Sequence, residues 1–377
     1  NGCKRMKLVF DIETDGLDAS KIWCIVAKDL DTNRVHSYDP DQIEEGLKLL
    51  VDSELLIGHN ILGFDIPVIE NLTGISFKNK KVIDTLVLSR LARPERGGHG
   101  LKAWGFNLGF NKGSMEEQGF TKYTKEMMEY CINDVELNTK VFYSILKELE
   151  GFDPKSIGLE HAVAVILKEQ EKHGFLFDEQ KGTILLAELN ERKRDIEATV
   201  QKVFKPKLVK LKTVQPKWKK NGCLSKQGLT DEEFLKILNK PKHAQLLAFD
   251  RCKLQEFNLG SRKQIGEYLK DFGWKPKKFT PTGQPIVDES TLNKVKNIPE
   301  AQLISRFLML QKRIAQVNSW FKHLENDQRV HGFVIPNGAI TGRMSHAKPN
   351  LAQIPAAYSP YGKDCRSCWI VPDEYRL

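Results

Sequence analysis

The sequence lacks any apolar stretch long enough to cross a membrane as a helix. None of its 377 residues falls in a run that approaches the about 20 apolar residues that a bilayer requires. The first apolar run, Leu8 to Phe10, is broken at once by Asp11, so no secretory signal peptide is visible. We therefore expect a cytoplasmic protein with no membrane partner.

Cysteine is scarce and irregularly spaced. The seven cysteines are an odd number scattered along the chain, which fits a reducing compartment better than a secreted disulfide framework. Cys365 and Cys368 form one CxxC, but no second pair completes a four-ligand zinc site, so we interpret both as ordinary thiols. The nine histidines form no HExxH motif and no Ser/His/Asp pattern.

Acidic residues are outnumbered by basic ones. Lys and Arg total 58 against 49 for Asp and Glu, a formal charge of +9 that suggests a polyanionic partner. Residues 202–220 hold eight lysines and no acidic residue, with Phe204 and Trp218 interleaved. Such a run can be a solvated surface and nothing more. We favour contact with a phosphate backbone, because aromatic residues accompany the lysines. The lysines expected to make it are Lys210, Lys212, Lys217, Lys219 and Lys220.

Short apolar runs bounded by turn residues predict an α/β domain over residues 1–150. The segments 7–13, 22–29 and 55–58 read as strands, because apolar and β-branched residues are concentrated in them. A helical pattern follows over 124–149. Strands mixed with helices favour a sheet that is packed by helices.

The chain after Gly151 is expected to be mostly helical. Asp178 is a suitable N-cap for a helix whose apolar residues recur at three-, four- and seven-residue spacing as far as Val203. A second apolar stripe within 300–323 steps by four and three residues. Each stripe needs a helical partner, so we predict that the two long helices pair as an antiparallel hairpin.

Acidic residues in three separate segments form a candidate metal site. Asp11 and Glu13 lie two apart in the first expected strand, so their side chains share a face. Two carboxylates on one face repel each other unless a cation lies between them, and oxygen ligands suit Mg²⁺ or Mn²⁺. A lone DxE is also common at exposed strand ends, and that alternative stays open for this motif by itself.

The helix expected over 124–149 places a further acid on a largely buried stripe. Tyr130 and Asp134 are four residues apart, so they stack on one face. A carboxylate there needs a partner, which a metal ion shared with Asp11 would supply. A third acid, Asp65, follows a strand end and a polar loop that begins at His59. Taken singly, Asp134 and Asp65 fit an ordinary surface position equally well.

Together these segments resemble the DEDD exonuclease superfamily, in the branch that contains a tyrosine. That family has DxE on its first strand, then an asparagine followed by a Phe-Asp pair, and YxxxD on a late helix. The matching residues are Asp11, Glu13, Asn60, Phe64, Asp65, Tyr130 and Asp134. The resemblance implies an RNase H-like mixed sheet with helices, and two-metal 3′→5′ hydrolysis of DNA.

The resemblance also implies a role for each side chain. Asp11 would bridge two Mg²⁺ or Mn²⁺ ions, and Glu13 with Asp134 would complete the site of the ion that binds the attacking water. Asp65 would hold the second ion through water, and Tyr130 would orient the nucleophile. Two such ions about 3.5–4 Å apart activate the water and stabilise the leaving oxygen, so no histidine base is required.

The C-terminal part carries a second pattern. Thr341-Gly342-Arg343 is followed by the run Pro349 to Pro355, with sequence PNLAQIP. This looks like the TGR…PNLxxIP signature that precedes the palm of family A DNA polymerases, in their short-tailed-phage branch. The resemblance extends from about residue 7 to residue 368. The DNA-contacting residues that it implies are Asn60, Phe64, Arg343, Asn350, Gln353 and Arg366.

This second resemblance implies three domains. An exonuclease domain over 1–150 would be followed by a mostly α-helical thumb over 151–335 and by the start of the palm over 336–377. The best-known phage members carry a long thumb insertion that docks thioredoxin, whereas 202–257 is shorter here and rich in lysine. Thioredoxin therefore stays an open question as a partner, and direct DNA contact is the expected substitute.

The acidic motif A of the palm and the fingers helix do not occur in these 377 residues. We expect either a truncated piece or one half of a split polymerase whose palm and fingers come from another chain, acting in the host cytoplasm if it is phage-encoded. Its DNA partners would be a single-stranded 3′ end and a primer-template, without polymerisation by this chain alone. Two alternatives remain: a non-catalytic DNA-binding subunit, and an RNA-processing exonuclease of the RNase D type.

Overall fold

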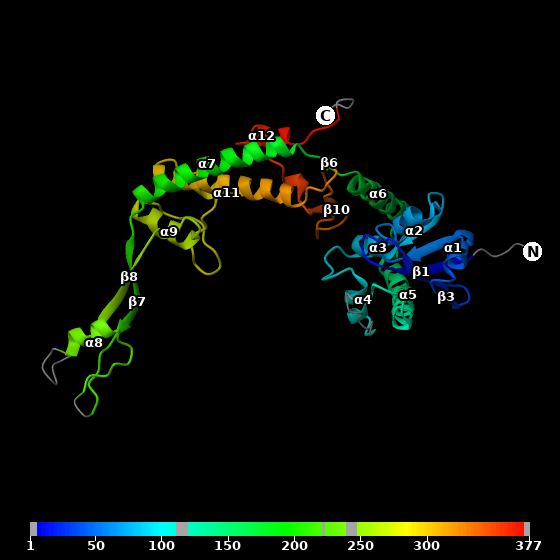
Figure 1. Cartoon of the computed structure of the whole chain (residues 1–377), viewed down its shortest axis with the longest axis horizontal. Coiled ribbons are helices and arrows are strands. Elements are labelled where there is room, and N and C mark those ends of the chain that lie inside the picture. Colours follow the sequence, from blue (N-terminus) through cyan, green and yellow to red (C-terminus); the bar gives the residue numbers. More distant parts are fainter. Residues whose placement is uncertain (1–5, 111–119, 221–222, 239–246, 373–377) are drawn as a thin grey trace, which may run out of the picture. The chain divides into compact units, whose positions relative to one another are not determined.

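The computed structural model describes residues 6–110, 120–220, 223–238 and 247–372 (Figure 1). The chain forms two compact units. The first comprises residues 1–179 and 320–377, and the second comprises residues 180–319. The expected division into three domains was based on function and stays a prediction. No helix among the described residues is long and apolar enough to span a bilayer.

The first unit is built on a five-stranded mixed sheet. Its strands are β1 (Lys7–Thr14), β2 (Ile22–Asp29), β3 (Val35–Tyr38), β4 (Leu55–Gly58) and β5 (Lys81–Asp84), in the spatial order β3-β2-β1-β4-β5. β1 pairs antiparallel with β2 and parallel with β4, so it lies at the centre. The expected strands and the mixed sheet are confirmed, and the assignment of the sheet to an exonuclease stays a prediction.

Helices cover both faces of this sheet (Figure 1). On one face, Leu8, Phe10 and Ile12 of β1 form a core with α1 (Ile43–Asp52) and α2 (Asp65–Thr73). On the other face, Val9 packs against Met127, Cys131 and Val135 of α5 (Lys125–Glu148). The short helices α3 (Thr85–Ala92) and α4 (Leu101–Asn107) share a further core with α5. Because side chains alternate along a strand, Asp11 and Glu13 belong to the α5 face with Val9.

The first unit continues with α6 (Pro154–His173), whose N-cap Asp153 accepts from the Lys155 N–H. Phe177, Trp320, Phe321 and Trp369 form an aromatic cluster with edge-on ring contacts. The remaining elements are β6 (Phe175–Leu176), β9 (Arg329–Val330), β10 (Phe333–Ile335), β11 (Ser345–Ala347), the 3-10 helix η2 (Leu351–Gln353) and α12 (Gly362–Ser367).

In the second unit, α7 (Glu179–Val203) and α11 (Pro299–Lys322) lie side by side (Figure 1). Val200 near the end of α7 shares a core with Ile304 near the start of α11, and the Lys193 Nζ lies 5.6 Å from the ring centre of Phe307. The helices are therefore antiparallel, as the two apolar stripes predict. The shorter helices are α8 (Asp231–Leu238), α9 (Arg262–Asp271) and α10 (Glu289–Leu292).

The lysine-rich region contains a feature that the sequence analysis did not anticipate. β7 (Lys207–Val214) and β8 (Phe249–Gln255) form an antiparallel hairpin. Phe204, which precedes β7, is only 1% exposed, and its ring stacks on that of Phe257 with 4.5 Å between the ring centres. The interpretation of Phe204 as an aromatic residue offered to nucleic acid is therefore wrong, because its ring belongs to the core of the second unit.

Phe204→Ala is expected to lower the free energy of unfolding by roughly 3–5 kcal/mol, the usual cost of removing a buried aromatic ring. Urea denaturation followed by circular dichroism measures the change. Phe279→Ala is the matched control and should cost little, because Phe279 is 52% exposed. Equal denaturation midpoints for Phe204→Ala and wild type would show that this packing is wrong.

Candidate metal and nucleic-acid site

Asp11 and Glu13 lie on the part of β1 that runs past its parallel neighbour. β1 pairs with β4 through Lys7, Leu8 and Val9 only, whereas its pairing with β2 continues along the whole strand. The edge of β1 that faces β4 is therefore available to other groups beyond Val9. Glu13 is buried and Asp11 is partly exposed, so the two carboxylates lie at the border between core and solvent.

Asp65 bonds to the part of the β1 edge that β4 does not pair with. It is the first residue of α2, and its Oδ1 accepts a hydrogen bond of 3.2 Å from the backbone N–H of Ile12, the residue between Asp11 and Glu13. Only 3% of Asp65 is exposed. Burial, chiefly, raises the pKa of the Asp65 carboxyl to about 7, so it is easily protonated when no cation is near. The Asp65 carboxylate therefore lies at the backbone between Asp11 and Glu13.

α5, the helix that carries the fourth acid, packs against the same strand. Its Cys131 thiol donates to the Asp11 carbonyl at 3.6 Å and lies 3.7 Å from Asp11 Oδ2. Asp134 follows three residues later, close to one helical turn along α5, and is 5% exposed. Tyr130 precedes Cys131 and is partly exposed. The helix that carries Asp134 and Tyr130 therefore contacts Asp11 through Cys131.

Cys131 is a site residue that the sequence analysis missed. Ligand atoms of Asp11, Glu13 and Cys131 all lie within 4.8 Å of one another, which is close enough to share one cation. Carboxylate oxygens fit Mg²⁺ or Mn²⁺, whereas a thiol is a soft ligand that these ions do not favour. The only available signal was position, because Cys131 stands between Tyr130 and Asp134 in the helical pattern.

Buried hydrogen bonds of Asp84 and Thr85 hold α5 and the loop before Asp65 in place. The Asp84 carboxylate accepts from the N–H groups of Asn60 (2.9 Å), Leu62 (3.0 Å) and Leu86 (2.9 Å), and burial raises its pKa. It therefore holds the loop that leads into Asp65. The Thr85 hydroxyl donates to Asn138 Oδ1 at 2.7 Å, which sets the position of α5 one turn after Asp134.

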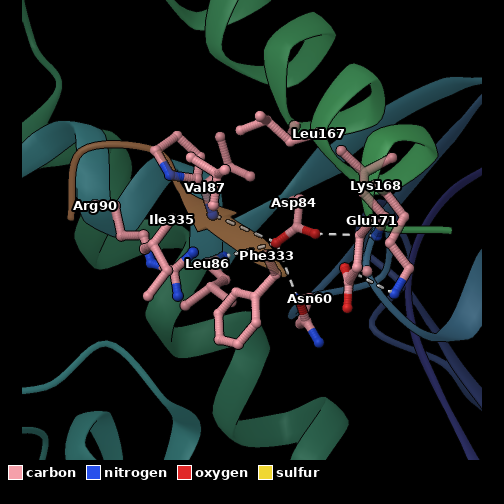
Figure 2. Close-up of a pocket in the computed structure, with 15 residues that line it drawn as sticks. Asn60, Asp84, Leu86, Val87, Arg90, Leu167, Lys168, Glu171, Phe333 and Ile335 are labelled. Carbon is pink, nitrogen blue, oxygen red and sulfur yellow. Dashed lines mark hydrogen bonds and ion pairs between the residues drawn. The ribbon is translucent and has the colours of Figure 1, made fainter. Parts of the chain in front are cut away.

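Asn60 and Phe64 lie on the loop that Asp84 holds. Asn60 is exposed, and its backbone has a φ of 65°. Its side chain lies against Gly63: a Cβ atom at position 63 would be only 2.4 Å from Asn60 Oδ1. Phe64 is partly buried against the first core. Beside this loop is a small cavity of about 150 Å³, shown in Figure 2. Its lining includes Asn60, Asp84 and Arg90 but none of the four predicted metal ligands.

The residues predicted to contact the primer-template lie elsewhere on the first unit. Arg343, Asn350, Gln353 and Arg366 are exposed. The Arg366 Nε donates to the Pro355 carbonyl at 2.9 Å, which ties α12 to the PNLAQIP run. The contacts described above for the acidic residues involve none of these four. Their contact with DNA stays a prediction.

The predicted lysines of the second unit are exposed, and one of them forms an ion pair. Lys210 pairs with Asp250 on the neighbouring strand at 2.8 Å, so a carboxylate distant in sequence compensates it in space. Lys212 has Arg251 as its cross-strand neighbour. Lys217, Lys219 and Lys220 follow the hairpin strand and are exposed as well. The expectation that no carboxylate compensates the run is therefore wrong for Lys210.

Comparison with known proteins shows similarity to DNA polymerases. Residues 225–377 match the model of DNA polymerase family A. The DNA-directed DNA polymerase of Enterobacteria phage T3 is 30% identical to 96% of the chain, and that of Escherichia phage T7 is equally similar. The chain is homologous to phage-type family A DNA polymerases. It spans 64% of the length of these two relatives, and the alignment with the first covers 461 residues, so that relative has segments that this chain lacks.

A solved structure supports the fold of this polymerase homologue. The POL domain of Pol1 from M. smegmatis, in a complex with DNA primer-template and dNTP, aligns with a TM-score of 0.68. The match covers 99% of this chain and 56% of that chain at 17% identity, so it is a likeness of fold. Pseudomonas aeruginosa DNA polymerase I is 29% identical over 40% of the chain.

The raised pKa of Asp65 predicts how the metal-free protein responds to pH. Between the ordinary value of 3.8 and about 7, the folded state holds a proton that the unfolded state has lost. The free energy of unfolding should therefore fall as pH rises through this window, by a few kcal/mol at most at about 1.4 kcal/mol per pKa unit. Urea denaturation in EDTA at several pH values measures this slope. Asp65→Asn should flatten it, and an unchanged slope in that variant would contradict the assignment.

Proposed function

We propose that this chain provides the 3′→5′ exonuclease and thumb functions of a phage-type family A DNA polymerase. The observation that carries the proposal is the hydrogen bond from the Ile12 N–H to Asp65, because it brings an acid from a distant segment to the backbone that joins Asp11 and Glu13. The seating of α5 on Asp11 through Cys131 supports a place for Asp134 in the same group. The homology to DNA polymerases favours DNA over RNA as the substrate.

The donor set fits divalent cations that prefer oxygen. Asp11, Glu13, Asp65 and Asp134 would hold two Mg²⁺ or Mn²⁺ ions, which would supply an activated water and stabilise the leaving oxygen of the phosphodiester. Carboxylates that are buried together repel one another, and such repulsion is relieved by cations. Burial, chiefly, raises the pKa of Asp65, so its carboxylate would be stabilised in its charged form by a nearby cation.

The protein groups around the acids would bind and orient the DNA end. Tyr130 is partly exposed on α5, four residues before Asp134, and would orient the attacking water. Asn60 and Phe64 lie on the loop before Asp65, where they would contact the terminal nucleotides. The buried bonds of Asp84 and Thr85 would keep that loop and α5 in position without touching the substrate.

The remaining residues would hold the rest of the DNA. Exposed lysines of the second unit would contact phosphates, and Arg343, Asn350, Gln353 and Arg366 would lie near the primer-template. The fold likeness to a polymerase domain supports this placement of the C-terminal residues. Polymerisation itself would need palm and fingers, which we propose are supplied by a further part of the polymerase. Thioredoxin stays an open question as a partner.

Asp11→Ala with Glu13→Ala should slow the digestion of a 5′-labelled single-stranded DNA by at least roughly 10²-fold, the scale for loss of a preorganised charged group. The wild-type reaction should require Mg²⁺ or Mn²⁺ and should stop in EDTA. Denaturing gels with time points give both rates.

The matched control is Asp41→Ala with Glu44→Ala, which removes two exposed acids from the same unit and should digest as fast as wild type. An RNA oligonucleotide of the same sequence separates a DNA exonuclease from an RNA-processing one. Equal digestion by wild type and the Asp11, Glu13 variant would remove the exonuclease proposal.

The lysine contacts can be tested by salt dependence. Replacing Lys217, Lys219 and Lys220 by alanine should weaken DNA binding and reduce the slope of log affinity against log salt by roughly 2 to 3, because each phosphate contact releases counterions. Fluorescence anisotropy with labelled DNA measures the slope. A control with Lys48, Lys78 and Lys102 replaced removes three exposed lysines of the first unit. Identical slopes for both triple variants would assign the lysine run to a solvated surface.

A further inference from the structure

The helix α6 contacts both α3 and β10, yet none of its 20 residues is fully buried. The cavity of about 150 Å³ beside Asn60 is lined by this helix, by β10 and by the loop that contains Asn60 (Figure 2). A helix that buries no side chain completely gains less from apolar packing than a core helix does. Its polar contacts therefore weigh more in fixing where it lies.

His161 connects α6 to the side of the unit that carries the candidate exonuclease site. The Asp84 N–H donates to His161 Nε2 at 2.8 Å, and His161 Nδ1 lies 2.8 Å from the Ile157 carbonyl. Because Nε2 accepts, the proton of the neutral ring is on Nδ1, which donates it to that carbonyl. The Asp84 carboxylate in turn accepts from the N–H groups of Asn60 and Leu62. His161 thus anchors the residue that holds the loop before α2.

Glu160, the neighbouring residue, connects α6 to the hairpin of β10 and β11. Its Oε2 accepts a hydrogen bond of 3.0 Å from Asn337 Nδ2. Asn337 lies in the loop between these two strands, and the same loop carries Thr341-Gly342-Arg343. A Cβ atom at position 342 would lie 3.6 Å from Asn337 Oδ1. The Asn337 side chain therefore bonds to α6 and lies beside this motif.

We propose that Glu160 and His161 are positioning residues that connect the loop before Asp65 to the hairpin loop that carries Arg343. Adjacent residues on an α-helix project about 100° apart, so one helix can contact two different elements at this point. A displacement of the hairpin loop would move α6 and, through His161 and Asp84, the loop before Asp65. Binding of a DNA end by the latter loop then depends on a contact made by the former.

The effect on digestion rests on the proposed function, whereas the connection between the two loops does not. The bonds of Glu160 and His161 could also serve only to hold α6 in place. In that case a change in the hairpin loop would leave the loop before Asp65 as it is. The two explanations therefore differ in what a substitution of Asn337 does at a distance.

The test uses the full chain and four variants. His161→Phe keeps a ring but removes the acceptor, whereas His161→Gln can place an amide oxygen near the position of Nε2. Asn337→Ala removes the donor to Glu160. His173→Phe is the matched control, because His173 is an exposed histidine at the end of the same helix.

Hydrogen exchange followed by mass spectrometry reports on residues 59–65 and 81–88, which contain the loop before α2 and the Asp84 N–H. Digestion of a 5′-labelled single-stranded DNA with Mg²⁺ gives kcat and KM. Circular dichroism checks that each variant is folded.

His161→Phe and Asn337→Ala should each speed exchange in both segments and raise KM by about three- to tenfold, the scale of one lost hydrogen bond. The change in kcat should be smaller than that in KM, because the proposed metal ligands are intact. His161→Gln should recover most of the loss, and His173→Phe should match wild type. The double variant of His161→Phe and Asn337→Ala should lose less than the product of the single losses, because both interrupt one connection.

Unchanged exchange in residues 59–65 and an unchanged KM in Asn337→Ala would overturn the proposal, even if His161→Phe were impaired. His161 would then act on Asp84 alone. If His161→Phe does not fold, Asn337→Ala decides, because Asn337 is a partly exposed loop residue. If even the wild type digests no DNA, the proposed function fails, and hydrogen exchange still decides whether the two loops are connected.

Discussion

The hydrogen bond between the Ile12 N–H and the Asp65 carboxylate is the contact on which the candidate site depends. β1 continues beyond Val9, its last residue paired with β4. The Ile12 N–H therefore has no partner on β4 and bonds to Asp65 instead. A buried N–H needs an acceptor, and the first residue of α2 supplies one. The same bond holds the Asp65 carboxylate at the backbone between Asp11 and Glu13. The contact that satisfies the Ile12 N–H thus also brings a third acidic residue to this stretch of β1.

The sequence was a good guide wherever the signal was periodic. Alternation in 7–13 placed Asp11 and Glu13 on one face, and the helical stripe of 124–149 placed Asp134 inward, because burial follows the geometry of strand and helix. Cys131 could not be found in this way, since a thiol beside a metal ligand and a thiol in a core have the same periodicity. Asp84 was also beyond reach, because it accepts from the Asn60 and Leu62 N–H groups of a loop whose proximity only the fold reveals.

The lysine-rich region shows why composition is a weaker guide than periodicity. Charge was counted along the chain, yet Lys210 is compensated across the hairpin by Asp250, about forty residues further along the chain. Phe204 was grouped with the lysines by proximity in sequence, although the backbone turns its ring into the core beside Phe257. Both errors come from treating neighbours in sequence as neighbours in space. The apolar stripes of α7 and α11 did not suffer from this, because each stripe specifies a buried face directly.

The β7–β8 hairpin has a consequence for the behaviour of the isolated chain. Among the described strands, β7 and β8 pair only with each other, so each keeps one edge open, and Leu208, Leu211 and Leu254 are exposed on them. An open edge with leucines is a template for strand addition between molecules, and lysines on such an edge oppose it by repulsion. The lysines of β7 therefore oppose strand addition at this edge. Variants that neutralise them would associate more readily than wild type, most of all at low salt, where the wild-type repulsion is least screened.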